Sequence, residues 1–373
     1  MKLLFFINSL SSGGAERVIT KLASHYGDAN HEASLVTLTS LDSDYYSVSP
    51  SVTRISLGAG GLSTGVVNAV ANNLRRHSKL RQLIRRMKPD AIIAFMPTAN
   101  VLAVLAAGKT AVIVSERVHP AFDPASKLRF WFKRFAYRRA SQVVVLSQIS
   151  SDWLQEKMGI EPCVIIPNGI ALPLPCEQPN VDPSAYIDAE ARLILVVGRV
   201  SDQKQPFVAL AAFEQFAAQS QNWHLVLIGS GDLDNTLKQA VQQSPHANCI
   251  HLVPRAGNIS AWYKRANIFL STAKYEGSPN ALMEAMAHGC PVLALDCPTG
   301  PADLIDNNSN GLLLPLEPTT DQAERISQAL LALGNNDTLR KRLGERAANI
   351  TNTHSDQTFF QRWTTLLPMQ DAN

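Results

Sequence analysis

The sequence lacks the marks of a membrane-spanning, exported or disulfide-bonded protein. Its apolar runs are short, and none approaches the ~20 residues of a spanning helix. Residues 1–10 hold one lysine and a short apolar run followed at once by SSGGAE, which fits a buried first strand better than an export signal. The five cysteines show no Cys-x-x-Cys spacing, and no histidine completes a zinc pattern. We therefore expect reduced thiols, no structural metal and a cytoplasmic protein.

The chain also has little net charge, but that charge is divided unequally. The formal net charge is +3 over 373 residues. Residues 1–178 carry 20 Lys and Arg against 12 Asp and Glu, whereas residues 179–373 carry 14 against 19. No nucleic-acid-binding motif accompanies the basic half, which argues against DNA or RNA as the partner. We expect only the first half to meet an anionic partner.

Short apolar segments alternate with helical stretches through both halves. The segments 2–7, 91–95, 192–200 and 290–296 each contain a short continuous apolar run, as strands of a parallel sheet covered on both faces do. The sequence therefore predicts an α/β protein of two Rossmann-like domains facing a central cleft, with ligands at the carboxyl ends of the strands. The expected segments are a first domain at 1–172, a proline-rich linker at 173–190, a second domain at 191–353, and a C-terminal helix at about 354–370 that crosses back to the first domain.

A glycine-rich turn follows the first predicted strand. Gly13 and Gly14 stand between this strand and a predicted helix. Two glycines let the backbone approach a bulky ligand, and a helix N-terminus offers N–H groups to anionic oxygens. The alternative is a tight turn without a ligand. The pattern is not G-x-G-x-x-G, so the set of that motif with an acidic residue about 20 positions on is not found, which argues against an NAD-dependent oxidoreductase.

Two further motifs carry charged residues at the ends of predicted strands. Arg199 and Lys204 follow one strand and are suited to clamp a diphosphate, although both could be solvated surface charges. Glu276 ends another strand, and Glu284 lies about one turn into the next helix. The alternatives are an exposed loop charge at Glu276 and a dipole-complementing charge at Glu284. The backbone between them could hold phosphate oxygens.

The order of these motifs resembles the retaining, GT-B-fold glycosyltransferases of family four. The matching pieces are SGGAE, VSER, IPNGI, VGRV with Lys204, IGSGD, YEGSPNALMEAMAHGCPVLALD and NGLLLP, from residue 9 to residue 315. The block that holds Glu276 and Glu284 is the most specific of them. The chain is most similar to bacterial members that build surface or lipid-linked glycans from UDP-sugars.

The resemblance implies a role for each matching position. Arg199 and Lys204 would bind the donor diphosphate and stabilise the leaving group, Glu276 would contact the transferred sugar, and Glu284 would hold the ribose hydroxyls. Many relatives carry a sugar-orienting histidine after the VSE strand, and either Arg117 or His119 could take that role here. The remaining implied contacts are Gly13 and Gly14 with the diphosphate, Arg255 with the nucleobase, and Ser278, Pro279, Asn280, Ala281 and Leu282 with the sugar and phosphates.

The activity implied by this resemblance is retaining transfer of an N-acetylhexosamine or hexose from a UDP-sugar. The acceptor would be a polyprenyl-diphosphate-linked or other surface glycan, and the resemblance implies neither a metal nor another cofactor. Cations at the diphosphate would offset the charge that develops as the anomeric bond breaks. The alternatives are a sugar-nucleotide epimerase of the same fold or a transferase to a soluble sugar.

The basic surplus of the first half gathers in two segments, 75–88 and 127–139. In the second, four apolar residues recur at helical spacing among the cations: Leu128, Trp131, Phe132 and Phe135. Such a helix suits the surface of an anionic membrane, which predicts a peripheral location on the inner face of the cytoplasmic membrane. The alternative for both segments is a solvated amphipathic helix packed on the sheet, and for 127–139 we expect the apolar stripe itself to pack there with the cations outside.

Overall fold

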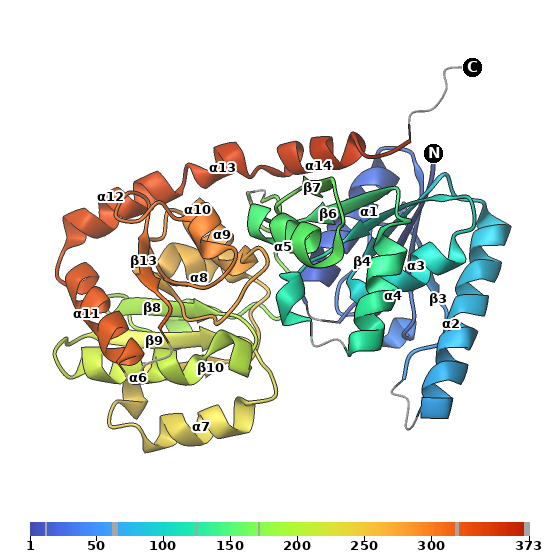
Figure 1. Ribbon diagram of the computed structural model, residues 1–373. Coiled ribbons are helices and arrows are strands. Elements are labelled where there is room, and N and C mark those ends of the chain that lie inside the picture. The colour runs from blue at the N-terminus through green and yellow to red at the C-terminus, as the bar shows by residue number, and fades with distance from the viewer. Residues whose placement is uncertain (12, 62–65, 124–125, 171, 318–320, 369–373) are drawn as a thin grey trace. The chain divides into compact units, whose positions relative to one another are not determined.

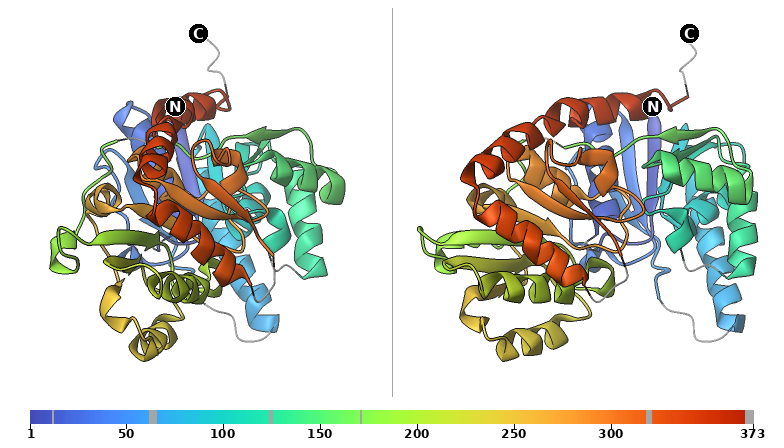
Figure 2. Two further views of the ribbon diagram at one scale, coloured as in Figure 1. Left: turned by 90° about the vertical axis from the view of Figure 1, so that its left-hand side faces the viewer. Right: turned by 60° about the vertical axis from the view of Figure 1, so that its left-hand side comes forward.

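The computed structural model divides the chain into two compact units (Figure 1). It describes residues 1–11, 13–61, 66–123, 126–170, 172–317 and 321–368. The first unit holds residues 1–168 and the chain from Gln357 onward, and the second unit holds residues 169–356. Helices lie on both faces of each parallel sheet (Figure 2), so the predicted α/β class with two Rossmann-like domains is confirmed.

Within its described residues, the first unit has a seven-stranded parallel sheet in the order β3-β2-β1-β4-β5-β6-β7. Its strands are β1 (Lys2–Ile7), β2 (Glu32–Thr37), β3 (Thr53–Ser56), β4 (Ala91–Phe95), β5 (Ala111–Ser115), β6 (Gln142–Val145) and β7 (Cys163–Ile165). Its helices are α1 (Gly14–Asp28), α2 (Val66–Met87), α3 (Pro97–Ala106), α4 (Lys127–Tyr137), α5 (Gln148–Met158) and α14 (Asp356–Thr364), with short 3-10 turns η1 (Leu41–Ser43) and η2 (Pro120–Phe122).

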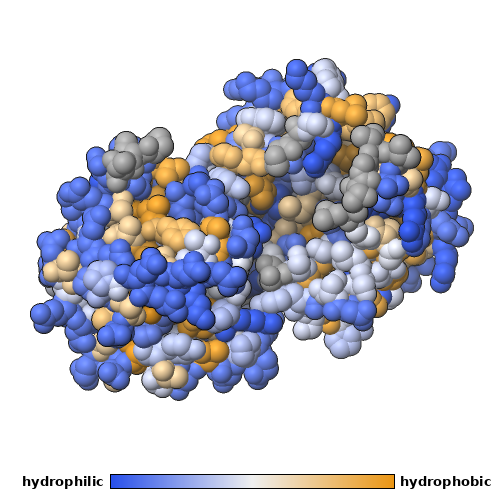
Figure 3. Space-filling view, turned by 90° about the horizontal axis from the view of Figure 1, so that it is seen from below, coloured by the Kyte–Doolittle hydropathy of each residue, from blue (hydrophilic) through white to orange (hydrophobic). Residues whose placement is uncertain are grey.

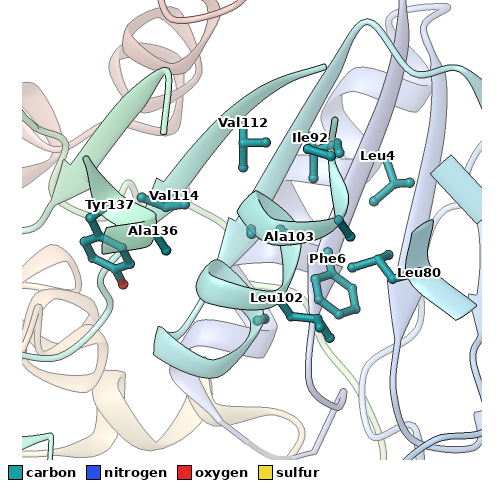
Figure 4. Close-up of a cluster of buried hydrophobic side chains, with 14 of the residues drawn as sticks. Leu4, Phe6, Leu80, Ile92, Leu102, Ala103, Val112, Val114, Ala136 and Tyr137 are labelled. Atoms are coloured by element: carbon teal, nitrogen blue, oxygen red, sulfur yellow. The ribbon is translucent and has the colours of Figure 1, made fainter. Parts of the chain in front are cut away.

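The strands of this sheet are buried on both faces because successive side chains alternate. Leu4 and Phe6 pack beneath α2, α3 and α4 in one core cluster (Figure 4). Leu3 and Phe5 point the other way and join a cluster with α1 and α14. This two-sided burial explains why the strands appear in the sequence as continuous apolar runs.

The C-terminal helix is shorter than the sequence predicts. Residues 354 and 355 are not helical, and the backbone on either side of them is bonded to Ile170: Ile170 N–H donates to His354 O and Asp356 N–H donates to Ile170 O. Helix α14 then runs only to Thr364, and residues 369 and 370 of the predicted helix lie outside the described residues. Phe359 and Trp363 are buried in the core of the first unit.

Within its described residues, the second unit has a six-stranded parallel sheet in the order β10-β9-β8-β11-β12-β13. Its strands are β8 (Arg192–Val197), β9 (Trp223–Ile228), β10 (Ile250–Val253), β11 (Ile268–Ser271), β12 (Val292–Asp296) and β13 (Leu312–Pro315). Its helices are α6 (Pro206–Ala217), α7 (Asp234–Gln243), α8 (Ile259–Arg265), α9 (Asn280–Ala287), α10 (Pro301–Leu304), α11 (Gln322–Gly334), α12 (Asp337–Ala347) and α13 (Ile350–Thr353), with 3-10 turns η3 (Pro183–Ala185), η4 (Asp202–Lys204) and η5 (Ala247–Cys249).

Residues 173–190, expected as a linker, pack on the second unit. Leu174 and Ile187 are buried in the core cluster that includes α8 and α9. The indole N–H of Trp262 donates to the carbonyl of Val181 at 3.1 Å. The prolines of this segment prevent regular structure without preventing burial of its apolar residues.

Strand order reverses between β1 and β4 in the first sheet and between β8 and β11 in the second. At such a point the loops leaving two neighbouring strands diverge, and ligands of parallel sheets bind there, outside the carboxyl ends. In the second unit, the segments that leave these two strands are 198–205 and 272–279. They carry Arg199, Lys204 and Glu276.

Candidate active site

A pocket lies at the reversal point of the second sheet. It is formed by the ends of β8 and β11, the loops that follow them and the start of α9. The predicted site residues that line it are Arg199, Lys204, Glu276, Pro279, Ala281 and Leu282. Ser278, Asn280 and Glu284 belong to the same loop and helix but do not line it, and Arg255 lies on the loop after β10. The structure therefore gathers both predicted cations and the loop carboxylate in one place.

Lys204 and Glu276 form an ion pair in this pocket. The ammonium group of Lys204 donates to Oε1 of Glu276, and the Glu276 residue is buried. Thr299 donates from its hydroxyl to the Glu276 carbonyl, which holds the backbone at the same point. A buried carboxylate is stable only when paired or hydrogen-bonded, so the cation and the anion hold each other in the pocket.

The two loops that carry this pair are cross-linked by polar side chains. The buried hydroxyl of Thr272 donates to the Lys204 carbonyl at 2.8 Å. The side-chain amide of Gln203 donates to the Tyr275 carbonyl at 2.9 Å, and Arg199 donates to its amide oxygen at 3.3 Å. Sequence reasoning missed Thr272 and Gln203, because their partners lie about 70 residues away. The one sequence feature that could have pointed to them is their position next to the motifs that hold Lys204 and Glu276.

A glycine is required where the loop after β9 meets the loop after β8. Gly229 has a φ of +142°, and a Cβ built on it would stand 1.9 Å from the carbonyl oxygen of Gly198. No side chain fits at that approach. The glycine of the IGSGD motif therefore lets two loops of the predicted donor site pack against each other.

Glu284 is held inside the second unit. It lies on α9 one turn after Ala281, is 5% exposed, and accepts a hydrogen bond at 2.9 Å on Oε2 from the Tyr263 hydroxyl. Arg255 is more open and pairs with Glu177 at 3.4 Å. Spacing in the sequence does not single out Tyr263, because its partner Glu284 lies 21 residues further along the chain.

In the first unit, Gly13 and Gly14 stand at the N-terminus of α1, and Ser12 of the same motif lies outside the described residues. Gly13 caps the helix in an extended conformation without a side-chain cap. A Cβ on it would meet only the flexible carboxylate of Glu16. The turn therefore brings the first N–H groups of a 15-residue helix to the carboxyl end of β1.

Arg117 and His119 both follow β5 and are both buried. The Arg117 guanidinium lies 4.7 Å from the Phe95 ring centroid and donates to Ser115 and Asn168. Burial lowers its pKa to about 9, which leaves it charged at neutral pH. His119 shares a hydrogen bond of 3.0 Å with the Ser150 hydroxyl. Burial, then the charge of Lys133, lowers the pKa of His119, which favours the neutral imidazole at pH 7.

Helix α4 is turned opposite to the expectation that its apolar stripe packs on the sheet. Its buried face carries Lys133, which forms an ion pair with Glu116 at 2.6 Å and a second with Asp123 at 3.5 Å. Tyr137 also donates to Glu116. A buried Glu116 needs a counter-charge, and Lys133 supplies it. The expectation that every cation of 127–139 lies outside is therefore wrong for Lys133. The stripe faces outward, with Leu128 67%, Trp131 59%, Phe132 51% and Phe135 46% exposed.

Two features are absent from the described part of the chain. No three His, Cys, Asp or Glu side chains among these residues lie together in a way that could hold a metal ion. No helix among them has the length and apolar character needed to cross a bilayer.

Comparison with known proteins places both halves of the chain in glycosyltransferase families. Residues 12–172 match the model of Glycosyltransferase Family 4, and residues 178–350 match that of Glycosyl transferases group 1. The chain is 25% identical to the amylovoran biosynthesis glycosyltransferase AmsD of Erwinia amylovora, over 98% of this chain and 99% of the relative.

The chain is also similar to an enzyme whose name states its acceptor. The chain is 26% identical, over 93% of its length and 92% of the relative, to the GalNAc-alpha-(1->4)-GalNAc-alpha-(1->3)-diNAcBac-PP-undecaprenol alpha-1,4-N-acetyl-D-galactosaminyltransferase of Campylobacter jejuni. Among solved structures, Anabaena Alr3699/HepE in complex with UDP and glucose matches with a TM-score of 0.78 at 18% identity, over 98% of this chain and 99% of that one. With both of its halves matched and its fold shared, the chain belongs to the GT-B-fold glycosyltransferases of the family-four type.

Proposed function

We propose that this glycosyltransferase moves an N-acetylhexosamine or hexose from a UDP-sugar to a polyprenyl-diphosphate-linked or other surface-glycan acceptor, with retention at the anomeric carbon. The observation that carries the proposal is the pocket that gathers Arg199, Lys204 and Glu276 at the reversal point of the second sheet. Two relatives support it. The Campylobacter jejuni enzyme is named for an undecaprenol-diphosphate-linked acceptor, and Anabaena Alr3699/HepE binds UDP and glucose.

In this proposal the pocket stabilises the leaving diphosphate. Breaking the anomeric C–O bond leaves negative charge on the β-phosphate and positive charge on the sugar ring. Arg199 and Lys204 are the cations placed to offset the negative charge on the β-phosphate, and they supply this stabilisation without a metal ion. Glu276 then contacts the transferred sugar. No second carboxylate flanking the bond is required, in contrast to most glycosidases.

For the sugar-orienting role we choose His119 over Arg117. The Arg117 guanidinium is already engaged by Phe95, Ser115 and Asn168. A neutral imidazole can both donate and accept hydrogen bonds, which suits a sugar hydroxyl. Replacing His119 with Ala is expected to lower kcat strongly and leave UDP affinity unchanged, since the contacts assigned to UDP do not include His119.

The donor class is tested by thermal unfolding of the purified chain with UDP-, GDP- and ADP-sugars and NAD(H). A ligand that binds only the folded state raises the unfolding temperature by mass action. The proposal predicts a selective rise with one UDP-sugar. A rise with a GDP- or ADP-sugar instead would overturn the UDP assignment, and a rise with NAD(H) alone would overturn the nucleotide-sugar donor altogether. Analysis of the product then separates transfer from epimerisation, because transfer yields a glycosylated acceptor and UDP, whereas epimerisation yields a second UDP-sugar.

A second part of the proposal places the first unit on an anionic membrane surface. Helices α2, α3 and α4 cover one face of its sheet, with α3 in contact with both others. None of the three contains Asp or Glu, whereas α2 carries six basic residues and α4 four, of which only Lys133 is buried. Hydrophobic residues reach the molecular surface among hydrophilic ones (Figure 3), and on α4 the exposed apolar stripe lies among cations. This pattern complements the charge and the apolar interior of an anionic bilayer.

Membrane binding is tested with vesicles of phosphatidylcholine alone and with added phosphatidylglycerol. The wild-type chain is expected to sediment with the anionic vesicles and less with the neutral ones. Replacing both Trp131 and Phe132 with Ala is expected to reduce binding about tenfold or more, from the apolar area lost. Leu41→Ala removes an equally exposed apolar side chain outside these helices and serves as control. Equal binding by both variants and the wild type would contradict docking through α4.

A further inference from the structure

Tyr263 and Glu284 form a buried polar pair, in which Glu284 has an assigned role and Tyr263 has none. Tyr263 is 1% exposed and lies on α8, and Glu284 is 5% exposed and lies on α9. The phenol hydroxyl donates to Oε2 of the carboxylate at 2.9 Å. Both residues belong to the core on one face of the second sheet. A tyrosine that only filled space in this core would not need a hydroxyl beside a carboxylate.

A second polar link joins the same two helices one turn away. Ser260 and His288 share a hydrogen bond of 2.8 Å between Oγ and Nε2, and His288 Nδ1 lies 2.7 Å from the backbone carbonyl of Glu284. The rings of Tyr263 and His288 are 5.3 Å apart. The Ser260–His288 link ties the helices together through the backbone of α9, whereas Tyr263 reaches the Glu284 carboxylate itself.

We propose that Tyr263 is a positioning residue for recognition of the nucleotide ribose. The inference rests on the proposed nucleotide-sugar donor and on Glu284 as the ribose-binding carboxylate. The last torsion of a glutamate side chain is broad, so a hydrogen bond to one carboxylate oxygen narrows the directions that the group can take. By holding Oε2, the Tyr263 hydroxyl sets the plane of the carboxylate and so the direction in which Glu284 accepts the two ribose hydroxyls. The hydrogen bond is charge-assisted and buried, which makes this direction firm.

The test compares the dissociation constants of UDP and 2′,3′-dideoxy-UDP, which lacks both ribose hydroxyls. The wild-type chain is expected to prefer UDP by about 10- to 100-fold, the range of a charged hydrogen bond. Tyr263→Phe keeps the ring and removes only the hydroxyl. It is expected to lower that preference by about fivefold or more through weaker UDP binding, with dideoxy-UDP affinity unchanged. Ser260→Ala breaks the neighbouring link and is expected to leave the preference at the wild-type value.

Glu284→Gln separates failure of this inference from failure of the proposed site. If Glu284→Gln keeps the wild-type preference, the ribose assignment itself is wrong. If it abolishes the preference but Tyr263→Phe keeps it, the proposed function stands and the positioning role of Tyr263 is overturned. An equal fall in Ser260→Ala and Tyr263→Phe would also overturn that role, since any loosening of the helices would then suffice. A chain that does not bind UDP at all would overturn both.

The comparison remains informative if Tyr263→Phe is less stable. A ratio of two dissociation constants from one preparation does not depend on the fraction that is folded. The double variant Tyr263→Phe/Glu284→Gln adds a second check, because a residue that acts only through Glu284 changes nothing once that carboxylate is gone. A further fall in preference in the double variant, beyond that of Glu284→Gln, would contradict the proposal.

Discussion

Lys204 and Glu276, 72 residues apart in the sequence, form an ion pair in the pocket of the second unit. Each belongs to one of the two loops at the point where strand order reverses. In the proposed function the two side chains serve different parts of the donor, the diphosphate and the sugar. Donor binding must therefore exchange part of this ion pair for contacts with the ligand, and that exchange has measurable consequences.

Replacing Glu276 with Gln is expected to separate nucleotide binding from turnover. Without the carboxylate, Lys204 no longer has to leave an anion to reach a phosphate, so affinity for UDP is expected to rise about 3- to 10-fold. The rate of sugar transfer is expected to fall about 100-fold or more because the sugar loses its contact. Calorimetric titration with UDP and a steady-state assay measure the two effects. Weaker UDP binding together with a normal rate would contradict the ion-pair exchange.

Thr272→Val is expected to misplace Lys204 at the edge of the pocket that both residues line. The hydroxyl of Thr272 is buried and donates to the carbonyl of Lys204 at 2.8 Å. Its loss leaves a buried carbonyl without that donor, which costs about 1–2 kcal/mol of unfolding free energy. We expect kcat to fall about tenfold, while Thr272→Ser retains the wild-type rate because it keeps the hydroxyl. A Val variant as active as the Ser variant would show that this hydrogen bond does not position Lys204.

Stability is expected to fall on mild acidification because of a histidine pair on β9 and β10. His224 and His251 lie 2.9 Å apart between ring nitrogens. Burial lowers the pKa of both, and the neighbouring His224 lowers that of His251 further. The unfolded chain, with the usual histidine pKa near 6.5, then binds more protons than the folded chain. The stability these residues contribute is complete above that value and is lost as the pH falls below it.

Thermal unfolding at pH 7.5, 6.5 and 5.5 measures this loss. The pKa values of His31 and His119 are also lowered by burial, so the first unit changes in the same direction. His251→Asn removes one partner of the pair and is expected to make the decline less steep. An unfolding temperature that rises between pH 7.5 and pH 5.5 would contradict the sign of these shifts.

Patterns that depend on neighbours in the sequence predicted much of the fold. The strand at 91–95 is found at the predicted bounds, because its side chains are apolar on both faces. The strand β3 was missed, since Thr53–Ser56 is short and only half apolar. The orientation of α4 was also missed. Its apolar stripe has the spacing of a face that packs in a core. Lys133 is buried instead because it pairs with the buried Glu116, which lies 17 residues earlier, and only the folded structure shows that Glu116 is buried.

The residues of the candidate site were also predicted only in part. The motifs directed attention to Lys204, Glu276 and Glu284, because their residue types and order resemble a family. Their partners could not be found from spacing. Tyr263, Thr272 and Lys133 each bond to a residue far away in the sequence, so only the fold brings these side chains to the groups they hold.

In the proposed function, Lys204 stabilises the leaving diphosphate of a nucleotide-sugar donor. The most direct test follows UDP release by NMR from UDP-glucose, UDP-N-acetylglucosamine and UDP-N-acetylgalactosamine, with water as the acceptor. Lys274→Ala is the control, because its ammonium group pairs with Asp202 at 2.7 Å on the same loops. We predict release from one donor at equal rates for wild type and Lys274→Ala, and about 100- to 1,000-fold slower for Lys204→Ala. Release by a folded Lys204→Ala variant at the wild-type rate would contradict the claim.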